Sequence, residues 1–229
     1  TVDQGLAFTD VAATSPYYDG IEWAVDEGIT NGTTATTFSP YQNCTRAQII
    51  TYLWRAAGSP EPASTDPAYT DVTDTSLYFF KAVQWASEQG LVEGETFDPY
   101  AGCTRAMAVY FMWVAADSPE AAAASFTDVA ADADYAAAVN WAVAQGVTLG
   151  TGDGSTFSPD TVCQRGQIVT FLYRAANAAS QITKQQPQGT LPAAVVYLPY
   201  RPRRLYSRIG MPSETVQRSR WSSTGGIPS

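Results

Sequence analysis

Hydrophobic positions recur along this chain in one order and at one spacing, three times over. Each copy opens with an aromatic residue followed by Thr-Asp-Val, at Phe8, Tyr69 and Phe126. Apolar residues at a spacing of three and four then predict a first helix. Each first helix contains a tryptophan, at Trp23, Trp85 or Trp141, and a glycine follows five residues later. Glycine at that place predicts the end of the helix, because it tolerates a left-handed backbone.

A second helix is predicted where Phe-x-Pro is followed, eight residues after the phenylalanine, by Arg46, Arg105 or Arg165. Thr45 and Gln48 have the spacing of a capping box, and Thr104 occupies the cap position in the second copy. Before the first helix of repeat one, the pair Ser15-Pro16 predicts the cap and the first helical residue. Gly58-Ser59-Pro60 and Asp117-Ser118-Pro119 predict the ends of two second helices.

A single unit of this kind, fewer than about 60 residues long, is too small to close a core alone. We therefore predict an all-α fold of three helix–loop–helix repeats in a pseudo-threefold arrangement around a central three-helix bundle. The second helices would form the bundle and the first helices would be satellites. The predicted repeats cover residues 1–62, 63–120 and 121–177, and residues 178–229 are predicted to be a basic, irregular and poorly ordered tail.

Charge divides the chain into an acidic body and a basic end. Residues 1–176 hold 6 Lys/Arg and 21 Asp/Glu, whereas the remaining residues hold 7 Lys/Arg and only Glu214. An acidic body argues against nucleic-acid binding. The chain has no histidine, so the commonest general base and metal ligand is missing. No apolar run is long enough to span a bilayer, and we expect neither a cofactor nor a bound metal.

Arg46, Arg105 and Arg165 each stand in the first turn of a predicted helix, where the partial positive charge of the helix end disfavours a cation. Two explanations remain open. An anion bound by the guanidinium and the helix N–H groups would account for them. A salt bridge to Asp10, Asp71 or Asp128 of a neighbouring repeat is the structural alternative, and the charge argument favours the anion. Repeat one, whose cap is complete, is the best candidate site.

Aromatic residues near the starts of the first helices are the candidate sugar contacts, because their polar tips reach solvent. They include Tyr18, Tyr78 and Tyr135. The three tryptophans lie among apolar neighbours, and we expect them in the core. The three cysteines, Cys44, Cys103 and Cys163, occupy one position of the repeat and form no Cys-x-x-Cys pair. We expect small buried thiols there.

The triplicated Phe-Thr-Asp-Val, Trp-Ala, Phe-x-Pro and Thr-Arg-Ala motifs over residues 8–176 closely resemble the S-layer homology domain. The resemblance implies three prongs around a central three-helix bundle. It also implies noncovalent attachment to the bacterial cell wall, through secondary cell-wall polysaccharide that often carries a pyruvate ketal, with the arginine of Thr-Arg-Ala at the groove. The sequence departs from the family at Met107, Gln164 and Gly166, and it lacks the family's His-Trp pair.

Three hypotheses follow. The first is a monomeric, extracellular cell-wall anchoring module that binds anionic polysaccharide and is not an enzyme. Its ligand-binding residues would be Arg46, Arg105, Arg165, Thr45, Gln48, Thr104, Tyr18, Tyr78 and Tyr135. The second is a structural or protein–protein interaction array without a glycan ligand. The third is part of a wall-associated hydrolase whose catalytic domain lies outside this chain.

Overall fold

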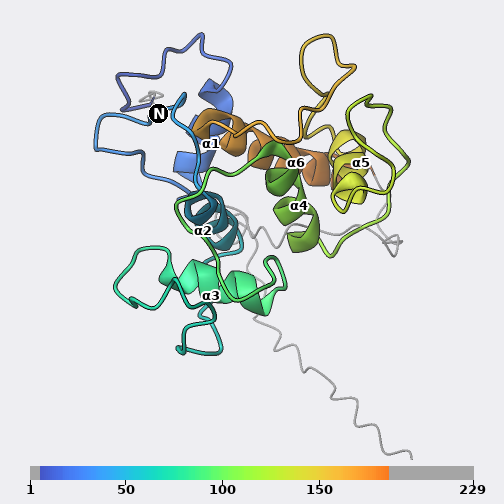
Figure 1. The fold of residues 1–229 in the computed structure, drawn as a ribbon. Coiled ribbons are helices and arrows are strands. Elements are labelled where there is room, and N and C mark those ends of the chain that lie inside the picture. Colours follow the sequence, from blue (N-terminus) through green and yellow to red (C-terminus); the bar gives the residue numbers. More distant parts are fainter. Residues whose placement is uncertain (1–5, 186–229) are drawn as a thin grey trace, which may run out of the picture.

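The computed structural model describes residues 6–185, and this part of the chain is all-α, as predicted. It contains six helices and, apart from isolated β-bridges, no strand. The helices are α1 (Tyr18–Asp26), α2 (Arg46–Ala56), α3 (Phe80–Glu88), α4 (Arg105–Ala115), α5 (Ala136–Ala144) and α6 (Arg165–Gln185). Short first helices alternate with longer second helices, and extended loops connect them (Figure 1).

The predicted start of α1 was wrong by two residues. The helix begins at Tyr18, and its N-cap, Tyr17, makes no capping hydrogen bond through its side chain. Ser15 instead closes a turn before the helix: its carbonyl accepts from the Tyr18 N–H at 3.0 Å and its hydroxyl from the Tyr17 N–H at 3.3 Å. A Ser-Pro pair suits such a turn as well as it suits a helix start, so the sequence alone did not separate the two.

The second helices begin where the sequence predicted. At α2 the capping box is complete, because the Thr45 hydroxyl accepts from the Gln48 N–H at 3.3 Å and the Gln48 side chain accepts from the Thr45 N–H at 3.0 Å. At α4 the Thr104 hydroxyl accepts from the Met107 N–H at 3.2 Å. These bonds satisfy N–H groups that have no partner inside the helix.

The second helix of repeat three, α6, is longer than the second helices of the other two repeats. In α2 and α4 a tryptophan near the end donates its indole N–H to a proline carbonyl beyond the helix, from Trp54 to Pro60 at 2.8 Å and from Trp113 to Pro119 at 2.9 Å. Repeat three has Tyr173 at that position and no glycine or proline nearby, so α6 continues to Gln185. Most of the predicted irregular tail, residues 186–229, lies outside the described residues.

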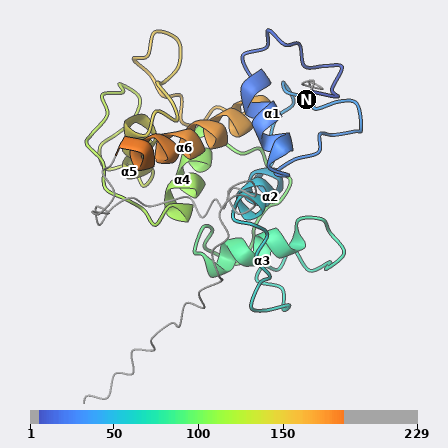
Figure 2. The same cartoon turned by 180° about the vertical axis from the view of Figure 1, so that it is seen from behind.

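Helix pairing differs from the expected bundle of second helices with satellites. Each first helix packs on the second helix of another repeat: α1 on α6, α3 on α2 and α5 on α4. Figures 1 and 2 show these three pairs from opposite sides. At the α1–α6 contact, a Cβ on Gly20 would lie 3.0 Å from the Cα of Thr170. Contact between the second helices α2 and α4 is less extensive. Each of these three helix pairs, which we call a lobe, is therefore built from two repeats.

Backbone hydrogen bonds link the three repeats in a closed cycle. The Cys103 N–H donates to the Cys44 carbonyl, the Cys163 N–H to the Cys103 carbonyl, and the Cys44 N–H to the Cys163 carbonyl, each at 2.8 Å. Two residues later the N–H groups of Arg46, Arg105 and Arg165 each donate to a carbonyl of another repeat, in the opposite direction round the cycle. Repeat three thus binds repeat one just as repeat one binds repeat two.

The Thr-Asp-Val and Phe-x-Pro motifs of each repeat bind each other. Both oxygens of the Asp128 carboxylate accept backbone N–H groups, from Phe157 at 2.8 Å and from Ser158 at 2.7 Å. Asp10 and Asp71 do the same in their own repeats. The middle residue of each Phe-x-Pro has a left-handed backbone, with φ of +59° at Ser158. The carboxylate thereby stabilises a backbone conformation that residues other than glycine rarely adopt.

The cysteines are buried thiols, as predicted. Burial raises the pKa of Cys44 and of Cys163 to about 12, so both stay protonated. Within residues 6–185 no group of His, Cys, Asp or Glu side chains is arranged to hold a metal ion. Trp85 and Trp141 lie in the core, whereas Trp23 is half-buried.

Candidate functional site

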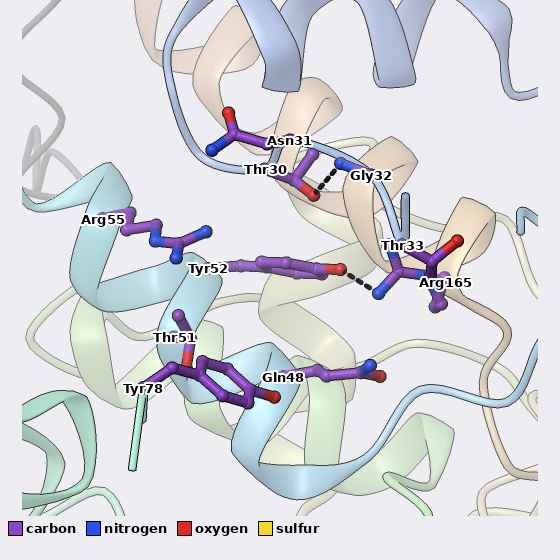
Figure 3. A pocket seen from close by; sticks show the side chains of 10 residues that line it. All are labelled: Thr30, Asn31, Gly32, Thr33, Gln48, Thr51, Tyr52, Arg55, Tyr78 and Arg165. Atoms are coloured by element: carbon purple, nitrogen blue, oxygen red, sulfur yellow. Dashed lines mark hydrogen bonds between the residues drawn. The ribbon is translucent and has the colours of Figure 1, made fainter. Parts of the chain in front are cut away.

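A pocket of about 380 Å³ opens beside α2, at a junction of three repeats (Figure 3). One wall is α2, the loop of residues 30–33 faces it, and side chains from repeats two and three complete it. The side chains and loop that matter below are Gln48, Tyr52, Arg55, Tyr78, Arg165 and residues 30–33. The pocket brings together three predicted contacts, Gln48, Tyr78 and Arg165, from positions far apart in the sequence.

Arg165 lies at the base of this pocket and is only 2% exposed. Its Nε donates to the Phe38 carbonyl at 3.0 Å and its Nη1 to the Tyr52 hydroxyl at 2.6 Å. Its guanidinium also lies over the Phe38 ring, 4.8 Å from the centroid, in a cation–π contact. The Nη2 atom is buried without a hydrogen-bond partner. Arg165 therefore fastens repeat three to repeat one and keeps an unused donor.

Tyr52 holds Arg165 as a neutral phenol. Burial raises the pKa of Tyr52 to about 12, although the charge of Arg165 acts in the opposite direction. The hydroxyl oxygen accepts from Arg165, and the Thr30 side chain is a further hydrogen-bond partner of Tyr52. The positive charge at the base of the pocket is thus not neutralised by a phenolate.

Arg105 is the corresponding residue between repeats two and three. Its Nε donates to the Phe157 carbonyl at 2.7 Å and its Nη2 to the Thr148 hydroxyl at 3.2 Å. The guanidinium lies 4.9 Å from the Phe157 ring centroid. Burial lowers the pKa of Arg105. The Phe157 carbonyl and ring stabilise the positive charge of its guanidinium.

Arg46 is the least buried of the three first-turn arginines. Its guanidinium lies over the Phe97 ring at 5.3 Å, and its Nε is buried without a partner among the described residues. Since the three arginines contact Phe97, Phe157 and Phe38 in turn, each repeat inserts its arginine against the Phe-x-Pro motif of another.

The alternative of an arginine–aspartate salt bridge is not what the structure contains. In the described part of the chain, the ion pair within 4.0 Å is Lys81–Glu61, between exposed side chains. Asp10, Asp71 and Asp128 accept backbone N–H groups instead. Aromatic rings and main-chain carbonyls contact the guanidinium groups directly. Asp71 and Asp128 interact with Arg46 and Arg105 through electrostatics beyond ion-pair distance.

The remaining predicted contacts are spread over the molecule. Tyr78 is 60% exposed and stands at the pocket. Tyr18 is the first residue of α1 and Tyr135 the N-cap of α5, and neither lines this pocket. Thr45 and Thr104 cap their helices. Gln48 both completes a cap and lines the pocket.

Arg55 is the pocket residue that sequence reasoning missed. It lies on the last turn of α2, half-buried, and its Nη1 donates to the Ile29 carbonyl at 3.0 Å. A signal was present: nine residues after the first-turn arginine stand Arg55 in repeat one and Arg174 in repeat three, but Val114 in repeat two. This variation within an otherwise regular repeat was informative.

The fold and the pocket define a class: a helical repeat protein whose units interlock and whose pocket forms where repeats meet. Residues 7–50 and 125–169 match the S-layer homology domain family. These two segments confirm the resemblance to the S-layer homology domain that the sequence motifs predicted.

The chain is also similar to an endoglucanase from Bacillus sp. (strain KSM-635). The two are 38% identical over 101 residues, which is 43% of this chain and 10% of that protein. The likeness thus covers only a small part of the endoglucanase. No helix within residues 6–185 combines the length and the apolar character needed to cross a membrane.

Proposed function

We propose that this chain is an extracellular module that anchors a protein noncovalently to the bacterial cell wall by binding anionic secondary cell-wall polysaccharide. The observation that carries the proposal is the pocket beside α2, whose lining includes two arginines and no carboxylate, in a body with far more acidic than basic residues. Such a pocket suits an anion. Resemblance to the S-layer homology domain supports the cell-wall location, and the module itself is not catalytic.

We further propose that residues 63–120 form a third module and that the three modules are arranged with pseudo-threefold symmetry as a monomer. The cyclic Cys44, Cys103 and Cys163 hydrogen bonds support this arrangement. So does the middle repeat's own Asp71 carboxylate, which binds its Phe-x-Pro motif as in the other two.

The test is cosedimentation with purified Gram-positive wall sacculi before and after extraction of their polysaccharide. We expect the chain to pellet with intact sacculi and to stay in the supernatant with extracted ones. Equal pelleting with both preparations, or none with either, would reject the proposal. Bovine serum albumin provides the control for passive trapping.

A second function, a structural or protein-binding array without a glycan ligand, is favoured by the burial of Arg105 and Arg165, which are 4% and 2% exposed. Both already have carbonyl and aromatic partners. Under this alternative their whole role is to fasten the repeats. The sacculus experiment separates the two functions.

A further inference from the structure

We propose that Arg55, rather than the first-turn arginines, is the main cation contacting the anionic group, and that the pocket beside α2 is the chain's principal ligand site. This inference rests on the proposed function, because it concerns where and how an anionic glycan is held. It assigns unequal roles to three positions that the repeat makes formally equivalent.

The first-turn arginine of this pocket is poorly placed for direct contact. Arg165 is 2% exposed, and its guanidinium is enclosed by the Phe38 carbonyl and ring and by the Tyr52 hydroxyl. Its one unpartnered nitrogen, Nη2, is closed off from solvent. From this depth Arg165 supplies positive potential at the base of the pocket, because charge acts over longer distances in a low-dielectric interior.

Arg55 is more exposed than Arg165 and makes fewer hydrogen bonds. Within the described residues its hydrogen bond is the one from Nη1 to the Ile29 carbonyl, which fixes the side chain against the 30–33 loop. A guanidinium has further N–H groups, and Figure 3 shows that of Arg55 on the side of the pocket across from Arg165. A carboxylate entering between them would be held at Arg55 and attracted by Arg165.

The rest of the lining suits a sugar. The Asn31 and Gln48 amides offer neutral donors, and the exposed ring of Tyr78 can stack on a pyranose face. The Thr33 hydroxyl is already hydrogen-bonded to Thr37 and Ser39. The pocket volume of about 380 Å³ falls in the usual range for small-molecule sites. The ligand class that fits is a carboxylate-bearing saccharide unit.

At the corresponding positions of repeat two, the side chains would repel an anion. Val114 replaces Arg55 and Met107 replaces Gln48, while exposed Glu93 and Glu95 replace Asn31 and Thr33. One cation is lost and two negative charges are gained, so binding there is disfavoured by charge alone.

Repeat three is intermediate. It keeps a cation at Arg174, whose Nη1 donates to the Val147 carbonyl at 3.2 Å. Leu149, 76% exposed, stands in place of Asn31, and Phe171 replaces Tyr52. Arg174 therefore provides a matched control: it has the same position in its helix and the same carbonyl contact, but neighbours less suited to a sugar.

The experiment is calorimetric titration of the full chain with polysaccharide released from Gram-positive sacculi. A preparation with its carboxyl groups reduced to alcohols is the neutral control. Arg55→Gln should weaken binding at least about tenfold, Arg55→Lys less, and Arg174→Gln by less than about threefold. The carboxyl-reduced polymer should bind poorly.

A second pair of variants avoids the Ile29 contact, in case Arg55→Gln alters the fold. Asn31→Glu places in the loop the carboxylate that repeat two carries as Glu93, at an exposed position. We expect it to weaken binding at least about fivefold, and Leu149→Glu to have little effect.

Each result supports or overturns a distinct statement. Equal losses for Arg55→Gln and Arg174→Gln, or for Asn31→Glu and Leu149→Glu, would overturn the unequal roles while leaving polysaccharide binding intact. Undiminished binding of Arg55→Gln or of the reduced polymer would overturn the anion contact. No binding by the unmodified chain would overturn both this inference and the proposed function.

Discussion

Aspartates at Asp10, Asp71 and Asp128 do more for the fold than their exposed positions suggest. Each uses both carboxylate oxygens to hold two successive N–H groups of the Phe-x-Pro motif. The residue between Phe and Pro is a serine or aspartate with positive φ, a conformation that is uncommon for residues other than glycine. The carboxylate stabilises this conformation, and the buried phenylalanine is thereby presented to the arginine of another repeat.

Replacing one carboxylate tests this role. Asp128→Asn removes a charged acceptor for the Ser158 N–H, and we expect it to lower the free energy of unfolding by about 1 kcal/mol. Urea denaturation at neutral pH is the measurement, with Asp132→Asn, an exposed acid nearby, as the matched control. An unchanged midpoint for Asp128→Asn would contradict the role.

Two of these carboxylates, Asp71 and Asp128, make stability depend on acid pH. Burial by itself would raise the pKa of Asp71 and of Asp128, but the backbone N–H groups outweigh it and lower both from the usual 3.8. A group with a lowered folded-state pKa stabilises the protein above its unfolded pKa, and that stability is lost as the pH falls through the folded value.

We therefore expect the melting temperature to fall more steeply below about pH 4 in the unmodified chain than in the double variant Asp71→Asn with Asp128→Asn. Differential scanning calorimetry over a series of acid buffers measures this. Parallel curves for the two proteins would show that these carboxylates do not titrate on unfolding in the stated direction.

Among the elements, α6 departs most from its sequence expectation, because it continues to Gln185. It begins at Arg165 as predicted, although Gly166 follows where repeats one and two have Ala47 and Ala106. The structure gives the reason for glycine: a Cβ there would lie 2.5 Å from Cδ2 and 2.7 Å from Cγ of Tyr17. The ring of the α1 N-cap occupies the space that alanine would need.

Gly166→Ala should consequently destabilise the chain, although alanine favours a helix by about 1 kcal/mol over glycine. In a Tyr17→Ala background the loss should be clearly smaller, because the ring is gone and only the Pro40 carbonyl oxygen, 3.1 Å from the added Cβ, remains close. Chemical denaturation of the four proteins of this double-mutant cycle measures the effect. An equal loss in both backgrounds would contradict the steric explanation.

Helix starts and stops were predictable where one local motif decides them. Thr45 with Gln48 fixes the start of α2, and the Gly58-Ser59-Pro60 segment follows its end. Ser15-Pro16 fitted a turn and a helix start equally well. The end of α6 was missed because it is set by the absence of a stop signal after Tyr173.

At the scale of the whole molecule, the chain forms a closed cycle of repeats. The sequence revealed the repeats and their buried faces but not which helix packs on which, since periodicity identifies an apolar face without naming its partner. The arginine contacts were equally hidden: Arg105 meets Phe157 across 52 residues, and Arg165 meets Phe38 across 127. What was predictable at the site was the unusual placement of three cations.

Because the described repeats form a closed cycle, we expect them to unfold cooperatively. A linear array can fray from its ends, but here α1 needs α6 and Arg165 binds the Phe38 carbonyl, so neither terminal repeat is free to open alone. Urea transitions followed by tryptophan fluorescence and by far-ultraviolet circular dichroism should coincide. Separate transitions by the two probes would indicate that the repeats unfold independently.

The packing of each repeat on its neighbours also constrains how the number of repeats can change during evolution. Because each lobe joins helices from two repeats, a single copy gained or lost during evolution would leave one helix without its partner and one aromatic ring without its cation. The interlocking therefore favours gain or loss of the three repeats as a set. Each copy can diverge only as fast as its neighbours tolerate, except at exposed positions of the pocket rim such as Asn31. Gly32 beside it is held to glycine, because a Cβ there would lie 2.5 Å from the Thr37 carbonyl oxygen.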